Sequence, residues 1–146
     1  MIILADSNIL TALAKRQSTQ YLETRRSLTI LRRRGDRICL VPQNFVEFWA
    51  VATRPIFSNG LGLDAAKAFV EVRKFKRYFE FFDDVPNIFA SWERLVAKYK
   101  VVGRNVHDTR LVAAMMQHGL SHILTLNVKD FKRFEEINVI DPSMVT

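Results

Sequence analysis

The chain begins Met1-Ile2-Ile3-Leu4-Ala5-Asp6-Ser7-Asn8-Ile9-Leu10, and this stretch decides the fold class. A short, continuous apolar run ends in an acidic residue and two small polar residues, after which a helical pattern starts. Apolar runs without polar alternation are typical of parallel strands that are buried on both faces. Asp, Ser and Asn favour the first positions of a helix. The stretch therefore predicts a buried strand that leads directly into a helix.

Short apolar runs and longer segments of helical period alternate in this way along the whole chain. The alternation predicts an α/β fold, with a central parallel sheet flanked by helices. The predicted strands are Ile2 to Ala5, Ile38 to Val41, Tyr78 to Phe82, Ile123 to Leu126 and Val139 to Ile140. The predicted helices are Ser7 to Lys15, Tyr21 to Arg34, Gln43 to Thr53, Asp64 to Arg77, Pro86 to Tyr99 and Asp108 to His118. A length of 146 residues with 49% hydrophobic content fits one domain over residues 1–146.

Several residues mark the ends of these predicted helices. Asp64 can cap the fourth helix, and Gly35 and Gly119 suit the left-handed residue that closes a helix. Pro86 fits a first-turn position. The segment from residue 54 to 62 joins two helices, and we expect it to form a rim rather than a linker between domains.

The chain is basic, with 22 Lys and Arg against 15 Asp and Glu and a formal net charge of +7. Nucleic acid is the commonest polyanion that such a surface would bind, and a cationic surface kept for solubility is the alternative. The single Cys39 lies in an apolar run, which predicts a strand position in the core and a reducing, cytoplasmic location. We see no secretory signal and no apolar run of about 18 residues, so no membrane segment is expected.

Four separated acidic residues, Asp6, Glu47, Asp108 and Asp130, lie where a strand passes into a helix or within the first turns of a helix. In parallel α/β sheets such positions converge on one crevice. Mg²⁺ or Mn²⁺ prefers oxygen ligands and takes only a few carboxylates from the protein, the rest coming from water and phosphate. The acids therefore predict a metal pocket, and the expected reaction is phosphodiester hydrolysis.

Two of these acids have a structural alternative in the first half of the chain. Asp6 could be a helix N-cap or a metal ligand, and the two roles can coexist; as a ligand it would have Asn8 orienting a carboxylate or a water beside it. Glu47 interrupts a mostly apolar helix. A carboxylate there needs a partner, which could be Arg54, solvent or a metal ion.

The acids of the second half carry alternatives as well. The apolar spacing after Asp108 turns it toward the sheet at a helix N-terminus, where it could be a structural cap or a ligand. Asp130 could be a ligand or a turn residue that caps a short helical segment, and Lys129 and Lys132 could offset its charge or hold phosphate. His107 is expected to be exposed or hydrogen-bonded, because no other histidine precedes it.

Four motifs together resemble the PIN-domain ribonucleases. They are Ala5-Asp6-Ser7-Asn8, Glu47 on the third helix, Val106-His107-Asp108-Thr109-Arg110-Leu111, and Leu124-Thr125-Leu126-Asn127-Val128-Lys129-Asp130-Phe131. The similarity runs from Met1 to Val139-Ile140-Asp141-Pro142. Each motif is weak alone, but the four in this order are specific. Many small members of similar size are VapC-like toxins of bacterial toxin-antitoxin pairs.

The resemblance implies a parallel sheet in the order 3-2-1-4-5 and an endoribonuclease that cleaves single-stranded RNA with Mg²⁺ or Mn²⁺. It implies that Asp6, Glu47, Asp108 and a fourth acid bind the metal and activate water. Many relatives have an acid where this chain has Asn127, followed by another that corresponds to Asp130. Thr125 would be a polar neighbour in the pocket. Toxin relatives usually form homodimers, and their antitoxins lay a helix and a basic tail over the pocket.

Two further surfaces bear on partners. Arginines crowd the second helix and its exit, and a second basic group lies on the fourth helix; each could be a solvated face or could contact phosphate. These residues are Arg25, Arg26, Arg32, Arg33, Arg34 and Arg37, and Lys67, Arg73, Lys74, Lys76 and Arg77. The following aromatic residues, Tyr78, Phe79, Phe81 and Phe82, are expected mainly in the core, with one at most exposed to stack a base. Leu10, Leu13, Phe45, Phe48 and Trp49 could form a groove for a partner helix or a second copy.

Other classes of function fit less well. A catalytically weakened PIN-like module that binds RNA or a protein is the main alternative, because Asn127 adds no charge to the site. A phosphatase with Asp6 as nucleophile would need an acid at the position of Asn8. Dinucleotide binding would need a glycine-rich turn after the first strand, which is absent.

Overall fold

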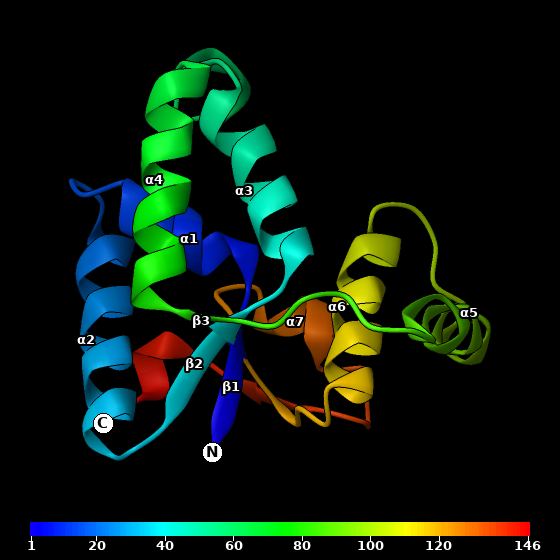
Figure 1. Cartoon of the computed structure of the whole chain (residues 1–146). Helices are drawn as coiled ribbons and strands as arrows, with labels where there is room; N and C mark the ends of the chain where they lie inside the picture. Colours follow the sequence, from blue (N-terminus) through cyan, green and yellow to red (C-terminus); the bar gives the residue numbers. More distant parts are fainter.

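The computed structural model describes residues 1–146 and contains five β-strands and seven α-helices (Figure 1). The strands are β1 (Ile2–Ala5), β2 (Arg37–Leu40), β3 (Glu80–Phe81), β4 (His122–Leu124) and β5 (Asn138–Ile140). The helices are α1 (Ser7–Ala14), α2 (Thr19–Arg33), α3 (Pro42–Thr53), α4 (Ala65–Tyr78), α5 (Ile88–Tyr99), α6 (Asn105–Gln117) and α7 (Val128–Phe131). Short 3₁₀ turns cover Ile56–Ser58 and Pro142–Met144.

The five strands form one sheet in the order β3-β2-β1-β4-β5, and every neighbouring pair is parallel. This confirms the predicted α/β class and the strand order. From the central β1 the chain first builds outward through β2 and β3, and it then returns to add β4 and β5 on the other side. The strand order thus reverses beside β1, and in such sheets the crevice for a ligand opens at the carboxyl ends of the strands at that point.

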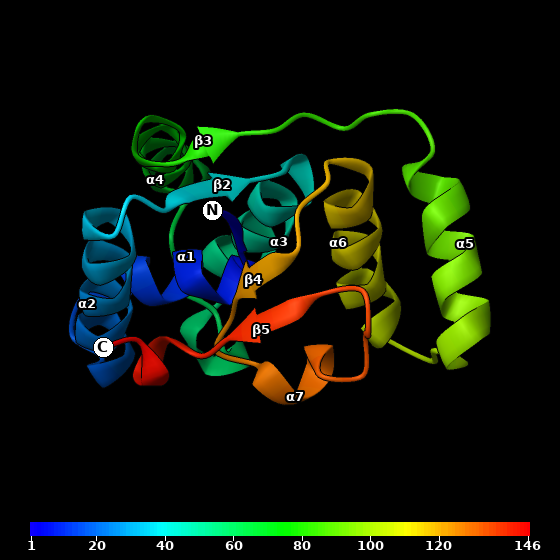
Figure 2. The same ribbon diagram turned by 90° about the horizontal axis from the view of Figure 1, so that it is seen from below.

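Both faces of the sheet are buried, which explains why the strands read as continuous apolar runs. Ile3 and Ala5 of β1 pack in one core with α1 to α4, whereas Leu4 packs in a second core with α5 and α6. Successive side chains of a strand point to opposite faces, so one strand supplies both cores. Figure 2 shows α1 to α4 on one side of the sheet and α5 and α6 on the other.

The predicted helix ends are partly confirmed. Asp64 caps α4 by accepting a hydrogen bond from the Lys67 N–H at 2.8 Å. Gly35 and Gly119 follow α2 and α6 with φ of +91° and +66°, a conformation that glycine adopts without strain. Pro86 is not in the first turn of α5: it precedes the helix, which starts at Ile88 after a left-handed residue.

Two other predicted boundaries are wrong by several residues. Tyr78 is the last residue of α4 and not part of a strand, because the hydrogen bonding of α4 continues up to Tyr78. Strand β3 starts two residues later, at Glu80. Helix α6 starts at Asn105 rather than at Asp108, since Gly103 with φ of +62° turns the chain one residue before Arg104 caps the helix. Asp108 is therefore the fourth helical residue.

Two predictions about surfaces also need correction. Leu10 and Phe48 are fully buried in the core beside β1, so they cannot form the proposed groove for a partner. Tyr78 and Phe81 are both exposed, 49% and 43%, where at most one aromatic was expected. Cys39 is buried as predicted, and burial raises the pKa of its thiol to about 12. None of the helices is long and apolar enough to cross a membrane.

Candidate active site

Asp6 lies at the carboxyl end of β1 and is only 5% exposed. Because Ala5 pairs with Leu124 in the sheet, the residues that follow them, Asp6 and Thr125, lie side by side. One Asp6 oxygen, Oδ1, accepts a hydrogen bond from the Ser7 N–H at 2.7 Å. The other, Oδ2, accepts one from the Thr125 hydroxyl at 2.7 Å. Asp6 is therefore the N-cap of α1 and at the same time a fixed carboxylate at the edge of the sheet.

Asn8, the second residue of α1, holds this arrangement in place. Its Nδ2 donates to the Thr125 hydroxyl at 3.2 Å, and its Oδ1 accepts from the Leu126 N–H at 3.2 Å. The Thr125 hydroxyl also accepts from the Asn127 N–H at 3.0 Å. Asn8 thus acts on Asp6 through Thr125 rather than by direct contact. The Thr125 hydroxyl has only one proton, which it donates to Asp6, so it can only accept the bonds from Asn8 and Asn127.

Glu47 reaches the same region from α3. Its Oε1 accepts a hydrogen bond from the Ser7 hydroxyl at 2.8 Å and a longer one from the Gln43 side chain at 3.4 Å. Asn44 is buried beneath them, where it accepts from the Val41 N–H at 2.8 Å and donates to the Ser7 hydroxyl at 3.4 Å. Glu47 forms no ion pair, so its partner is the polar end of α1 and not a basic side chain.

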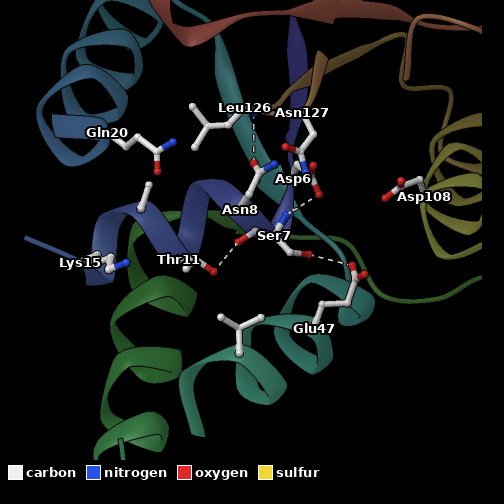
Figure 3. Close-up of a pocket in the computed structure, with 12 residues that line it drawn as sticks. Asp6, Ser7, Asn8, Thr11, Lys15, Gln20, Glu47, Asp108, Leu126 and Asn127 are labelled. Carbon is white, nitrogen blue, oxygen red and sulfur yellow. Dashed lines mark hydrogen bonds between the residues drawn. The ribbon is translucent and has the colours of Figure 1, made fainter. Parts of the chain in front are cut away.

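Asp108 faces these residues from α6 on the other side of the crevice. Figure 3 shows its carboxylate pointing from the helix toward Asp6 and Asn127. It does not cap α6, which has no side-chain cap, so the structural-cap alternative is wrong. The Asp108 carboxylate takes no part in any side-chain hydrogen bond or ion pair of the chain. Its charge is thus left for a ligand or for solvent.

These residues line one open hollow with a volume of about 390 Å³. Asp6, Glu47 and Asp108 lie at one end, and Lys15 and Gln20 lie at the other, beyond the last turn of α1 (Figure 3). The remaining lining residues are Ser7, Asn8, Thr11, Ala12, Val51, Leu126 and Asn127. Three of the four predicted acids are therefore brought together from β1, α3 and α6.

The pKa values of two of these acids, Asp6 and Asp108, are raised. Burial raises the pKa of Asp6 to about 6, the charges of Glu47 and Asp130 add to the rise, and the bonds from Thr125 and Ser7 oppose it. The pKa of Asp108 rises to about 7, first through burial and then through the charges of Asp6, Asp130 and Glu47, against a small opposing effect of Arg104. The hollow thus concentrates negative charge, and its acids form no ion pair with a cation of the chain.

Asn127 and Asp130 are the two candidates for the fourth ligand position, and they lie in different places. Asn127 lines the acidic hollow, whereas Asp130 lies in α7 and lines a neighbouring hollow of about 330 Å³ together with Asn127 and Asp141. Asp130 is still close enough to raise the pKa of both Asp6 and Asp108. Neither Lys129 nor Lys132 forms an ion pair with it.

The donor set suits a hard cation, with one restriction. No three carboxylate, imidazole or thiol groups of the chain are already arranged around a common point. Mg²⁺ commonly binds through one or two carboxylates, several waters and substrate phosphate, so it does not need a complete protein cage. The fit rests on the charge, because burial and then the neighbouring carboxylates raise the pKa of Asp6 and Asp108, and a divalent cation would lower it again.

Sequence reasoning did not assign three polar residues that shape the site. Ser7 joins Asp6 to Glu47, Asn44 supports Ser7 from a buried position, and Gln43 also donates to the His107 carbonyl of α6 at 2.7 Å. The available signal was the pair Gln43-Asn44 directly before an apolar helix, because a buried amide needs hydrogen-bond partners. His107 contributes this carbonyl, and its side chain is no part of the acidic hollow.

Comparison with known proteins gives the family. The chain is similar in structure to VapBC2 from Rickettsia felis bound to a promoter DNA fragment, with a TM-score of 0.73, 15% identity and coverage of 97% and 98% of the two chains. DNA-bound VapBC from Salmonella typhimurium gives a TM-score of 0.71 at 18% identity, covering 97% and 99%. VapC20 from Mycobacterium tuberculosis, a Sarcin-Ricin loop cleaving toxin, gives 0.60 at 14% identity, covering 84% and 87%.

These identities are low, so the three structures show a common fold. A search of curated proteins gives no match. The family model of the PIN domain, however, matches residues 3–137, nearly the whole chain, and includes every acid of the hollow. The chain therefore belongs to the PIN domain family.

Proposed function

We propose that this protein is a Mg²⁺- or Mn²⁺-dependent endoribonuclease that cleaves single-stranded RNA. The observation that carries the proposal is the group of Asp6, Glu47 and Asp108 in one hollow, with Asp130 beside it and no ion pair to any of the four. Such a set is stable at neutral pH only at an electrostatic cost, which a bound cation would remove. Nuclease activity also agrees with membership of the PIN domain family.

Asp6, Glu47 and Asp108 are the residues that would hold the cation, with Asp130 or the amide of Asn127 completing the site. A divalent cation bound there would lower the pKa of a coordinated water and offset charge on the scissile phosphate. Two hydrogen bonds fix the orientation of Asp6, and the Ser7 hydroxyl fixes that of Glu47. The chain thus presents two oriented carboxylates and one free carboxylate, that of Asp108, to the same space.

We further propose that the protein is the toxin of a toxin-antitoxin pair. The support is the similarity over nearly the full length to VapC proteins solved in VapBC complexes, and to a toxin named for the loop it cleaves. A protein antitoxin and a second copy of the chain are the proposed partners. With Leu10 and Phe48 buried, a partner would have to use other residues than the groove predicted from sequence.

Incubation of the purified protein with a set of RNAs tests the enzyme. Cleavage is expected with Mg²⁺ or Mn²⁺ and not with EDTA, and the double variant Asp6→Ala/Asp108→Ala should lose it. Equal cleavage by the wild type and the double variant would show a contaminating nuclease and refute the assignment. Binding of RNA without cleavage at any metal concentration would identify the weakened, non-catalytic module instead.

A further inference from the structure

The excess positive charge of the chain lies entirely on two of its segments. The first segment is residues 19–37, which contains α2 and ends at Arg37, the first residue of β2. The second is residues 65–82, which contains α4 and β3. Together they hold eleven of the 22 Lys and Arg but only four of the 15 acids. The rest of the chain is balanced, with eleven of each. These two segments thus carry the whole net charge of +7. Figures 1 and 2 show α2 and α4 on the same side of the molecule.

Contacts join the carboxyl ends of these two helices into one surface. The Arg32 guanidinium of α2 lies over the Tyr78 ring at 3.7 Å from its centroid and donates to the Tyr78 carbonyl at 2.6 Å. Arg37 at the start of β2 forms a bidentate ion pair with Glu80 of β3. The two basic segments are therefore held together at this end by side chains from both.

Most of these cations have no anionic partner. Only Arg37 and Lys74 of the eleven form ion pairs. The nine others, here called the basic surface, are Arg25, Arg26, Arg32, Arg33, Arg34, Lys67, Arg73, Lys76 and Arg77. All except Arg32 are classed as exposed. Tyr78 and Phe81, half-exposed aromatics, lie among them, with Lys76 placed 5.7 Å from the Phe81 ring centroid. Unpaired cations interleaved with exposed rings are suited to a nucleic-acid backbone and its bases.

The part of the basic surface at the carboxyl end of α2 lies away from the acidic hollow. Gln20, at the start of α2, lines the outer end of the hollow, whereas Arg33 and Arg34 lie at the other end of that helix. Fifteen helical residues separate the two ends of α2, a distance of about 22 Å at the rise of an α-helix. A ligand that occupies both places must extend along this helix.

We propose that the basic surface is a second RNA-binding site, which holds a folded RNA by its phosphates while another part of the same molecule enters the acidic hollow. The choice of RNA rests on the ribonuclease function proposed above. The substrate class is accordingly an RNA large enough to reach both places, and a short oligonucleotide would fill only the hollow. Recognition at the basic surface is through charge and does not depend on base sequence.

RNA binding by an Asp6→Asn variant in EDTA tests this site without cleavage. The test pair is Arg33→Gln/Arg77→Gln. The control pair is Arg94→Gln on α5 with Lys100→Gln directly after that helix, which changes the net charge equally on the other side of the sheet. Each lost phosphate contact lowers the slope of log K against log salt by about 0.7, so the test pair should weaken binding of a folded RNA by about 10- to 30-fold near 0.1 M salt. The control pair should change it less than about 2-fold.

A second pair, Arg26→Gln/Arg73→Gln, should act in the same direction as the first. Equal weakening by test and control pairs would overturn the proposal, because net charge alone would then explain binding. So would a complete lack of RNA binding by Asp6→Asn. These outcomes are separate from the enzyme assignment. With Mg²⁺ and otherwise wild-type protein, the test pair should still cleave a short oligonucleotide at the wild-type rate and lose rate only on the folded RNA.

Discussion

The acidic hollow and the basic surface are opposite in charge but alike in one respect: neither is neutralised by the rest of the chain. Asp6, Glu47, Asp108 and Asp130 form no ion pair, and neither do the nine cations of the basic surface. Some charges elsewhere are paired, as Lys98 is with Glu136 at 2.8 Å. What sets the two places apart is that unpaired charges of one sign gather there, so that a ligand can supply the counter-charge, a cation in one and a polyanion in the other.

The largest effect is expected from Asp108→Asn. The exchange keeps the shape of the side chain and removes the carboxylate that has no partner in the protein. RNA cleavage should fall by more than about 100-fold, the upper end for a residue that only orients a metal ligand. Gel assays of RNA cleavage report on the acidic hollow, and filter assays of RNA binding report on the basic surface. RNA binding by Asp108→Asn in EDTA should not weaken.

The matched control is Asp83→Asn, an exposed acid before α5. Its cleavage rate should equal that of the wild type. If both variants lost the same activity, the charge of the whole molecule and not the hollow would control the rate, and the contrast between the two regions would fail.

The metal-free protein should become less stable as the pH rises from about 4 to about 7. The pKa values of Asp6 and Asp108 are raised in the folded state, to about 6 and about 7. The folded state therefore binds these protons more tightly than the unfolded state, and their contribution is complete below pH 4 and lost as pH passes through the folded values. The loss attributable to the buried Asp6 is on the order of 2–3 kcal/mol, and the more open Asp108 adds less.

Urea unfolding in EDTA at pH 4 and pH 8 measures this loss, with Mn²⁺ added in parallel at pH 8. Mn²⁺ should restore stability at pH 8 in the wild type. In Asp6→Asn/Asp108→Asn the pH dependence should flatten and the protection by Mn²⁺ should disappear. Protection that persists in the double variant would place the cation outside the hollow.

A smaller effect is expected from Thr125→Val, which removes the hydroxyl that donates to Asp6. The buried carboxylate would lose a hydrogen bond, at a cost of about 1–3 kcal/mol in the free energy of unfolding. The bond from Thr125 lowers the pKa of Asp6, so its loss should move the acidic limb of the cleavage profile to higher pH. Thr109→Val is the control, because the buried Thr109 hydroxyl donates only to the Asn105 carbonyl of its own helix. A profile unchanged in both variants would contradict the role of Thr125.

Much of the fold could be predicted because strands that are buried on both faces of the sheet appear in the sequence as continuous apolar runs. The strands Ile2 to Ala5 and Ile38 to Val41 were nearly correct in their limits, since each is a continuous apolar run between polar residues. The edge strand β3 was not, because it has two residues and follows a helix without a break. Asp108 was correctly placed in the crevice, although the start of its helix was missed.

The polar connections of the site were harder to predict, for a physical reason. Ser7 and Glu47 are 40 positions apart and touch only because α3 crosses the end of α1. No periodic pattern records such a contact. The sequence also could not show that Asn127 and not Asp130 lines the acidic hollow, because this depends on how the short helix α7 directs the two side chains.

The smallest effect, and the one that sharpens the comparison most, is expected from Glu80→Gln. Arg37 donates to both Glu80 oxygens, at 2.6 Å and 2.5 Å. Because of this ion pair, Arg37 is not one of the nine cations of the basic surface. Removal of the Glu80 charge would free Arg37 for phosphate, and binding of a folded RNA should tighten by about 5-fold near 0.1 M salt, with a slope steeper by about 0.7. The thermal midpoint should hardly move, because an exposed ion pair contributes little to stability. Glu93→Gln on α5 makes the same change in net charge away from the basic surface and should leave RNA affinity unchanged. An equal gain from Glu93→Gln would mean that RNA responds to the total charge of the chain and not to the basic surface.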